Sequence, residues 1–124
     1  MTMTKLINAA QVGEPQANAD GSSRWEFRFR MSDTVFAGHF PGRPLLPGIF
    51  QPEIARIISE KALGEKLMVS EIAKAKFQKP VLPEETLRVD LKLTNKEKLI
   101  QARANFFVNG RAVGETILLL CRRD

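Results

Sequence analysis

The sequence predicts an α+β domain in which an antiparallel sheet of five to six strands covers one long helix. One stretch, residues 49–63, repeats apolar residues at helical spacing, whereas much of the remaining chain alternates apolar and polar residues as half-buried strands do. An Asn-Gly pair and several proline-containing breaks separate the alternating stretches, which is the pattern of antiparallel hairpins. The 124 residues contain no internal repeat, so we expect a single domain over residues 1–124.

The N-terminal part of the chain contains two predicted strands. Leu6 to Val12 could form the first, and Asn18 to Ser23 is predicted to be a turn, because Asn, Asp and Gly tolerate a positive φ. From Arg24 to Arg30 the alternation is complete, with three aromatic residues on one side and charged residues on the other. This segment is expected to be a strand with one face in the core.

One long helix is predicted from about Ile49 to Leu63. Starting at Phe50, apolar residues follow the i, i+4, i+7, i+8 spacing of one buried face. Gly64 is a plausible left-handed C-cap. Pro52 is tolerated only in the first turn, so the helix should begin close to Gly48.

The rest of the chain is predicted to be sheet. Pro80 to Glu85 is a break with two prolines, Asn95 to Glu97 is a turn, and Asn109-Gly110 is the strongest short hairpin pattern in the chain. The strands between these breaks are Ser70 to Phe77, Leu87 to Leu93, Leu99 to Val108 and Ala112 to Cys121. Their order predicts a long antiparallel meander.

The stretch from Ala37 to Glu53 contains the side chains with the clearest chemistry. His39, the only histidine, has an unperturbed pKa near neutrality, which suits a general acid or base, although a structural loop histidine is the simpler alternative. Gly48 lies at the expected helix N-terminus, where backbone N–H groups and the helix dipole could hold an oxyanion. Glu53 could serve catalysis or could simply pair with Arg56, three residues on.

A base, a carboxyl and an oxyanion site together suit removal of a proton α to a thioester, followed by loss of a β-hydroxyl, which is a dehydration. We expect no metal site, because one histidine, one cysteine and scattered carboxylates give no ligand cluster. The glycines match neither the Rossmann nor the Walker spacing, which argues against a phosphate-binding loop.

A single cysteine, no signal-peptide pattern and no apolar run near 20 residues favour a cytoplasmic protein that spans no membrane.

Short motifs along the chain match a known family in both type and spacing. They are Gly38 to Pro44, Leu46 to Gly48, Glu53, Lys76-Phe77, Lys79 to Val81, Pro83, Leu87 and Asn109 to Arg111. From roughly Met31 to its end, the sequence resembles the hot-dog-fold (3R)-hydroxyacyl-acyl-carrier-protein dehydratases of bacterial fatty-acid synthesis. The resemblance implies a hot-dog fold, in which the sheet wraps one long central helix. It also implies that two protomers join their sheets edge to edge, with active sites at their interface.

The resemblance further implies roles for individual residues. His39 would be the catalytic base, Glu53 of the opposite protomer would act on the leaving hydroxyl or a water, and the Gly48 N–H would bond the thioester carbonyl. The substrate-binding residues would be Phe36, Phe40, Pro47 and Ile49. No metal or organic cofactor is implied. The acyl chain would arrive on the phosphopantetheine arm of an acidic acyl carrier protein, a suitable partner for a chain of net charge +5. The expected assembly is a homodimer or a trimer of dimers.

Departures from the family pattern favour a relative from a dedicated lipid or polyketide-like pathway. Ile57 stands where the family usually has glutamine, and Pro83 to Glu85 replaces a Pro-Gly-Asp turn. Other functions remain open, namely a hot-dog thioesterase or a non-catalytic module that binds acyl thioesters or nucleic acid. Against nucleic acid, the sequence has no helix-turn-helix, no zinc spacing and no clustered basic stripe.

Overall fold

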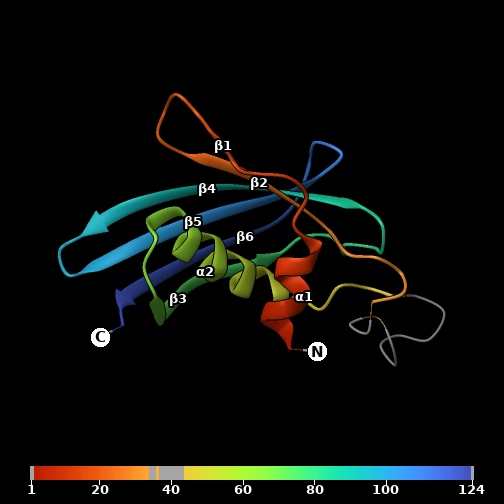
Figure 1. The fold of residues 1–124 in the computed structure, drawn as a ribbon, viewed down its shortest axis with the longest axis horizontal. Coiled ribbons are helices and arrows are strands. Elements are labelled where there is room, and N and C mark those ends of the chain that lie inside the picture. Colours follow the sequence, from red (N-terminus) through yellow and green to blue (C-terminus); the bar gives the residue numbers. More distant parts are fainter. Residues whose placement is uncertain (1, 34–35, 37–43, 124) are drawn as a thin grey trace.

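The structure is a computed structural model that describes residues 2–33, 36 and 44–123. Over these residues the chain forms one six-stranded antiparallel sheet and two helices, both on the same side of the sheet (Figure 1). The helices are α1 (Met3–Ala10) and α2 (Phe50–Leu63). The strands are β1 (Gln16–Ala17), β2 (Ser23–Arg28), β3 (Leu67–Phe77), β4 (Thr86–Lys96), β5 (Leu99–Val108) and β6 (Arg111–Arg122). The predicted α+β class is therefore confirmed.

Helix α2 is the long helix that the sequence predicts. It ends at Gly64, whose φ of 68° is left-handed and whose N–H donates to the Glu60 carbonyl oxygen at 2.8 Å, as expected of a C-cap. Pro52 lies in the first turn, where its missing N–H interrupts no helical bond. Ile54 and Ile58 on the inner face are fully buried. Because α2 contacts β3, β4, β5 and β6, it anchors the core against most of the sheet.

Strand β2 and Phe29, the residue that follows it, supply aromatic side chains to this core. Trp25, Phe27 and Phe29 are all buried, as the alternation predicts. The Phe29 ring meets the Phe50 ring of α2 edge to face, with centroids 5.7 Å apart. Each such aromatic side chain contributes roughly 2–3 kcal/mol through burial alone. The start of α2 is thereby fixed against the sheet.

The N-terminal segment differs from the prediction. Leu6 to Val12 was expected to be a strand, but residues 3–10 form helix α1. The Thr2 hydroxyl caps this helix by accepting a hydrogen bond from the Lys5 N–H at 3.2 Å. Leu6 and Ile7 are both buried, which a helix face allows. In a strand these two consecutive residues would point to opposite faces.

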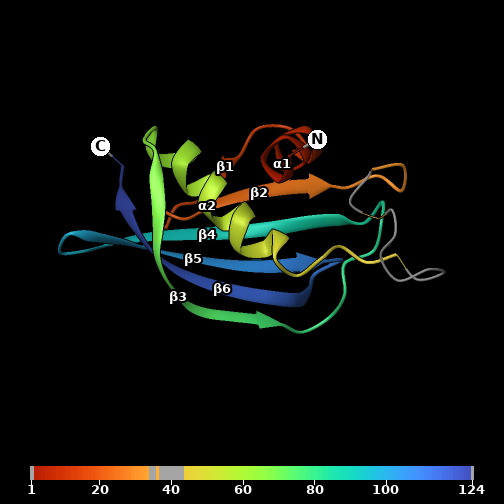
Figure 2. The ribbon, with the colours of Figure 1, turned by 90° about the horizontal axis from the view of Figure 1, so that it is seen from below.

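The position of β3 is the second correction. The strand order is β1-β2-β4-β5-β6-β3, so only β4, β5 and β6 form a meander, and β3 lies at the edge beside β6 (Figure 2). The segment between β3 and β4 contains no strand, and its first N–H groups, those of Gln78 and Lys79, donate to the Val113 carbonyl oxygen. This segment is long enough to carry the chain past the ends of β6 and β5.

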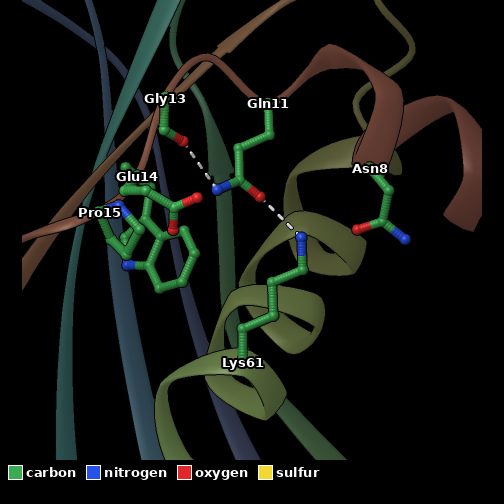
Figure 3. Close-up of a pocket in the computed structure, with 7 residues that line it drawn as sticks. Asn8, Gln11, Gly13, Glu14, Pro15 and Lys61 are labelled. Atoms are coloured by element: carbon green, nitrogen blue, oxygen red, sulfur yellow. Dashed lines mark hydrogen bonds between the residues drawn. The ribbon is translucent and has the colours of Figure 1, made fainter.

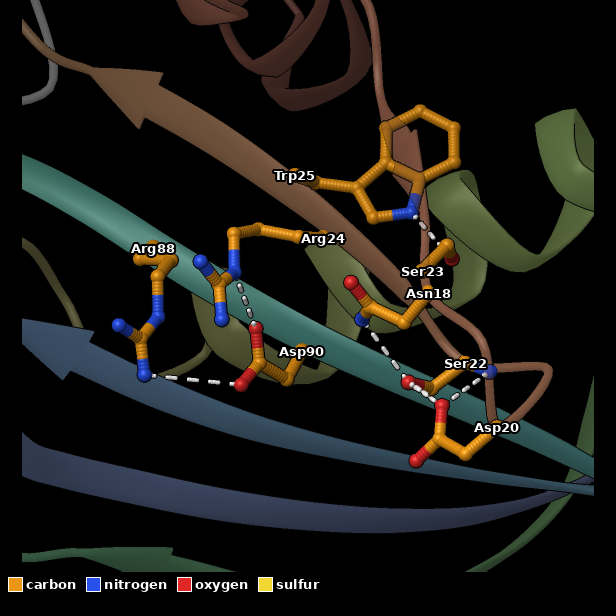
Figure 4. Close-up of polar contacts among 8 residues, drawn as sticks. All are labelled: Asn18, Asp20, Ser22, Ser23, Arg24, Trp25, Arg88 and Asp90. Atoms are coloured by element: carbon orange, nitrogen blue, oxygen red, sulfur yellow. Dashed lines mark hydrogen bonds and ion pairs between the residues drawn. The ribbon is translucent and has the colours of Figure 1, made fainter.

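The turn predicted before β2 is also present (Figure 4). Asp20 accepts hydrogen bonds from the Ser22 N–H at 3.0 Å and from its hydroxyl at 2.6 Å, and these bonds lower the pKa of the Asp20 carboxyl.

On the outer face of the sheet, Asp90 of β4 pairs with Arg24 at 3.3 Å and with Arg88 at 3.5 Å. This face is polar, whereas the core lies on the helix side. Neither helix within residues 2–33 and 44–123 has the length and apolar character to cross a membrane.

Candidate functional site

Of the predicted site residues that the structure describes, Pro47, Gly48, Ile49 and Glu53 lie at the start of α2. The Phe50 N–H donates to the Pro47 carbonyl oxygen and the Gln51 N–H to that of Gly48, each at 3.0 Å. Ile49 already has helical φ and ψ angles of −58° and −21°. Gly48 therefore lies at the helix start, as predicted. His39 and Phe40 lie outside the described residues.

An open groove of about 500 Å³ runs beside Gly48. Its walls come from the loop before α2, the first turn of α2, and the end of β3 with the segment that follows. The Leu46 N–H donates to the Val81 carbonyl oxygen at 2.8 Å, which ties two of these walls together. The lining includes the apolar Leu45, Pro47, Phe77 and Val81 and the polar Gln51 and Lys79. A groove with an apolar lining and few polar groups suits an acyl chain.

Two glycines allow the start of α2 to dock onto the corner between β3 and β6. A Cβ at Gly48 would lie only 3.3 Å from the Phe77 ring of β3. A Cβ at Gly114 of β6 would overlap the side-chain oxygen of Gln51. Phe77 and Gly114 are themselves paired across the two strands. Each glycine thus makes room for a side chain from the opposite element, and the backbone of Gly48 is held at the groove.

Glu53 follows on the same helix and is ion-paired. Its carboxylate, whose side chain is 27% exposed, accepts hydrogen bonds from Nε of Arg56 at 3.1 Å and from its Nη2. Arg56 Nη1 also contacts the Glu60 carboxylate at 3.1 Å. The hydrogen bond to Glu53 is the main cause that raises the pKa of Arg56. The pairing of Glu53 with Arg56 that the sequence suggested is therefore confirmed, and the carboxylate stays partly open to solvent.

Comparisons with known proteins identify the family. Residues 15–112 match the model of the ApeI-like family, described as ApeI dehydratase. This chain belongs to the ApeI-like dehydratase family. The predicted resemblance to hot-dog dehydratases is therefore confirmed.

Individual relatives of this ApeI-like protein agree with the family match. It is 31% identical to the 3-hydroxyacyl-[acyl-carrier-protein] dehydratase FabZ of Hydrogenobaculum over 104 residues, which cover 76% of this chain and 70% of the relative. It is 36% identical over 98 residues to the bifunctional enzyme LpxC/FabZ of Chlorobaculum tepidum, covering 72% of this chain but 21% of that enzyme. Among solved structures, the dehydratase heterocomplex ApeI:P from Xenorhabdus doucetiae superposes with a TM-score of 0.76 at 25% identity. That match covers 90% of this chain and 96% of the other, and it confirms the hot-dog fold.

The four predicted substrate-binding residues fall in different places in this ApeI-like chain. Pro47 lines the groove, Ile49 is exposed at the helix start, and Phe36 is buried in the core. Phe40, as noted, is not among the described residues. Their contacts with substrate stay predictions.

Gln51, which was not among the predicted site residues, lines the groove and is 4% exposed. Its side-chain oxygen Oε1 is buried and has no hydrogen-bond partner among the described residues. Helical spacing could have pointed to it, because Gln51 precedes Ile54 by three residues and Ile58 by seven, on the buried face. A polar residue at core spacing was the pattern to notice.

A second hollow, of about 600 Å³, lies between α1, the start of β2 and the end of α2 (Figure 3). Lys61 donates to Oε1 of Gln11 at 2.7 Å, and Nε2 of Gln11 donates to the Gly13 carbonyl oxygen at 3.1 Å. These hydrogen bonds link the end of α1 to α2. In the part of the chain that the structure describes, no three His, Cys, Asp or Glu side chains are grouped to hold a metal ion.

Proposed function

We propose that this protein dehydrates 3-hydroxyacyl thioesters to trans-2-enoyl thioesters. The observation that carries the proposal is the position of Gly48, at the N-terminus of α2 and on the lining of the apolar groove, in a member of a dehydratase family. The N-terminus of a helix is positively polarised, and its N–H groups stabilise negative charge on a nearby oxygen. A thioester carbonyl bound there would be activated for loss of its α-proton.

The reaction then needs one base and one acid. His39 takes the proton from C2 of the acyl chain, and the resulting negative charge collects on the thioester oxygen, where the Gly48 N–H stabilises it. The C3–O bond breaks as the C2–C3 double bond forms. The leaving hydroxyl takes up the proton that His39 now holds, through a water oriented by the Glu53 carboxylate of the opposite protomer, and departs as water.

The exposed edge strand β3 supports a homodimer in which such a shared site can form. Every residue from Met68 to Phe77 is exposed, including Ile72 at 50% and Phe77 at 53%. A long exposed edge strand readily pairs with another chain, and Met68, Val69, Ile72 and Phe77 give this strand exposed apolar side chains. In the proposed dimer two β3 strands lie side by side and join the two sheets. The groove beside Phe77 would then face the partner's half of the interface.

The charge of the chain supports an acyl carrier protein as the donor of substrate. The net charge is +5, and carrier proteins of this kind are acidic. Lys79 lines the groove, and an adjacent hollow contains both Lys79 and Arg111. These cations stand where the carrier would dock while its phosphopantetheine arm enters the groove.

The direct test is to incubate the protein with a 3-hydroxyacyl carrier protein and to measure the enoyl thioester. We expect wild-type protein to form it and the His39→Ala variant to form none. Absence of turnover by the wild-type protein, or equal turnover by the variant, would contradict the proposal. Release of free thiol without enoyl product would instead indicate a thioesterase. Tight binding without either product would indicate a non-catalytic module.

A further inference from the structure

Gln51 presents a buried polar atom that the fold itself does not satisfy. Its side chain is 4% exposed, and Oε1 has no hydrogen-bond partner among the described residues. Buried amide oxygens are nearly always hydrogen-bonded, because leaving one unpaired removes its bonds to water without replacement. Because Gln51 is also one of the residues that line the groove, its unpaired oxygen suggests that a ligand bound there completes it.

The surroundings of this oxygen show which kind of group is missing. Oε1 occupies the space above Gly114, where any larger residue would displace it. The Lys76 carbonyl oxygen also borders this space, 3.0 Å from the position that a Cβ of residue 114 would take. Both atoms are hydrogen-bond acceptors. The ligand must therefore contribute a donor.

We propose that Gln51 Oε1 accepts a hydrogen bond from the 3-hydroxyl group of the acyl substrate. This inference rests on the proposed function. The hydroxyl is the hydrogen-bond donor on the reacting part of a 3-hydroxyacyl thioester. It is bonded to C3, the thioester carbonyl oxygen is bonded to C1, and only C2 lies between these two carbons. Gln51 and Gly48 belong to the same helical turn, since the Gln51 N–H donates to the Gly48 carbonyl oxygen at 3.0 Å. The turn that leads into α2 thus holds both oxygen substituents of the substrate.

The role assigned to Gln51 is recognition and not proton transfer, because an amide does not titrate near neutral pH. Its hydrogen bond orients the C3–O bond and makes the groove selective for hydroxylated acyl chains over saturated ones. A site that offers a buried acceptor to a substrate hydroxyl discriminates against an analogue that lacks the hydroxyl, because that analogue leaves the acceptor unpaired.

Thr116 provides a matched control. Its Oγ1 is also buried and has no partner within the described chain, and it lies on β6 two residues from Gly114. Thr116 does not line the groove. The Thr116→Val substitution therefore removes an equally buried polar atom without touching the proposed contact.

The test compares two pantetheine amides of the same chain length, one 3-hydroxylated and one saturated, by titration calorimetry. We expect wild-type protein to bind the hydroxylated amide about tenfold more tightly, the equivalent of one net hydrogen bond. Gln51→Leu should lose this preference, bind the saturated amide as the wild type does, and melt no lower than the wild type. Thr116→Val should keep the preference.

The inference is overturned if the wild-type protein shows no preference, if Gln51→Leu keeps it, or if Gln51→Leu weakens both ligands equally. It is also overturned if Thr116→Val removes the preference to the same extent. Because binding is measured without turnover, the two proposals fail separately. A preference that depends on Gln51 in a protein that forms no enoyl product would refute the dehydration alone. Normal dehydration without that preference would refute the role of Gln51 alone.

Discussion

The contact between Gly114 and Gln51 can be tested by a double-mutant cycle. In Gly114→Ala the new methyl group would overlap Oε1 of Gln51 and lie 3.0 Å from the Lys76 carbonyl oxygen. Overpacking of this kind costs about 1–3 kcal/mol, and replacing glycine within a strand returns about 0.5–1 kcal/mol. We therefore expect Gly114→Ala to lower the free energy of unfolding by about 1–2 kcal/mol.

The second arm of the cycle repeats the substitution in a Gln51→Ala background. The overlapping amide is then gone, so Gly114→Ala should cost less than about 1 kcal/mol, and the two changes should couple by about 1 kcal/mol. Urea unfolding followed by circular dichroism measures each variant, at one protein concentration because association would shift the stability. Additive effects, with coupling below about 0.3 kcal/mol, would refute the packing of Gln51 onto Gly114.

Three further outcomes are expected. Ile72→Asp, which puts like charges into the proposed β3–β3 contact, should give a monomer by light scattering and abolish enoyl formation; a fully active monomer would contradict the shared site. Lys79→Glu should lower kcat/KM for carrier-linked substrate, most strongly at low salt, and leave kcat/KM for a pantetheine-linked substrate unchanged; equal losses on both would argue against a carrier contact. Hydrogen bonds from Lys74 and Arg103 lower the pKa of Glu115 in the folded protein. The ionised carboxylate therefore stabilises the fold at pH values above the pKa that Glu115 has in the unfolded chain. This stabilisation is lost as the pH falls through the lowered pKa of the folded state. Glu115→Gln should therefore cost up to about 1 kcal/mol at neutral pH and nothing in acid, as thermal melts across pH would show.

Elements with a strong local pattern were predictable from the sequence. The hairpin between β5 and β6 follows from Asn109 and Gly110, whose φ angles of 52° and 77° are the positive values that a tight hairpin turn needs. The end of α2 follows from Gly64 in the same way. Helix α1 was missed because a window that begins at Leu6 leaves out the capping residue Thr2 and the apolar Met3, which complete the helical pattern.

Features that depend on contacts between distant segments were not predictable. The alternation in β3 does not say which neighbour it pairs with, and pairing with β6 becomes visible only once the whole sheet is formed. At the site, the position of Gly48 follows from the local start of α2. The packing of Gln51 against Gly114, in contrast, joins the first turn of α2 to β6. Neither residue alone reveals the other, so the unpaired amide could be found only in the structure.

The central claim is that each active site combines His39 of one protomer with Glu53 of its partner. Two inactive variants, His39→Ala and Glu53→Gln, can be co-expressed with different affinity tags and purified as the mixed dimer. A two-fold dimer of this composition has one site with both residues intact and one site with neither, so we predict about half of the wild-type enoyl formation. A mixed dimer as inactive as the two parent homodimers would contradict the shared site.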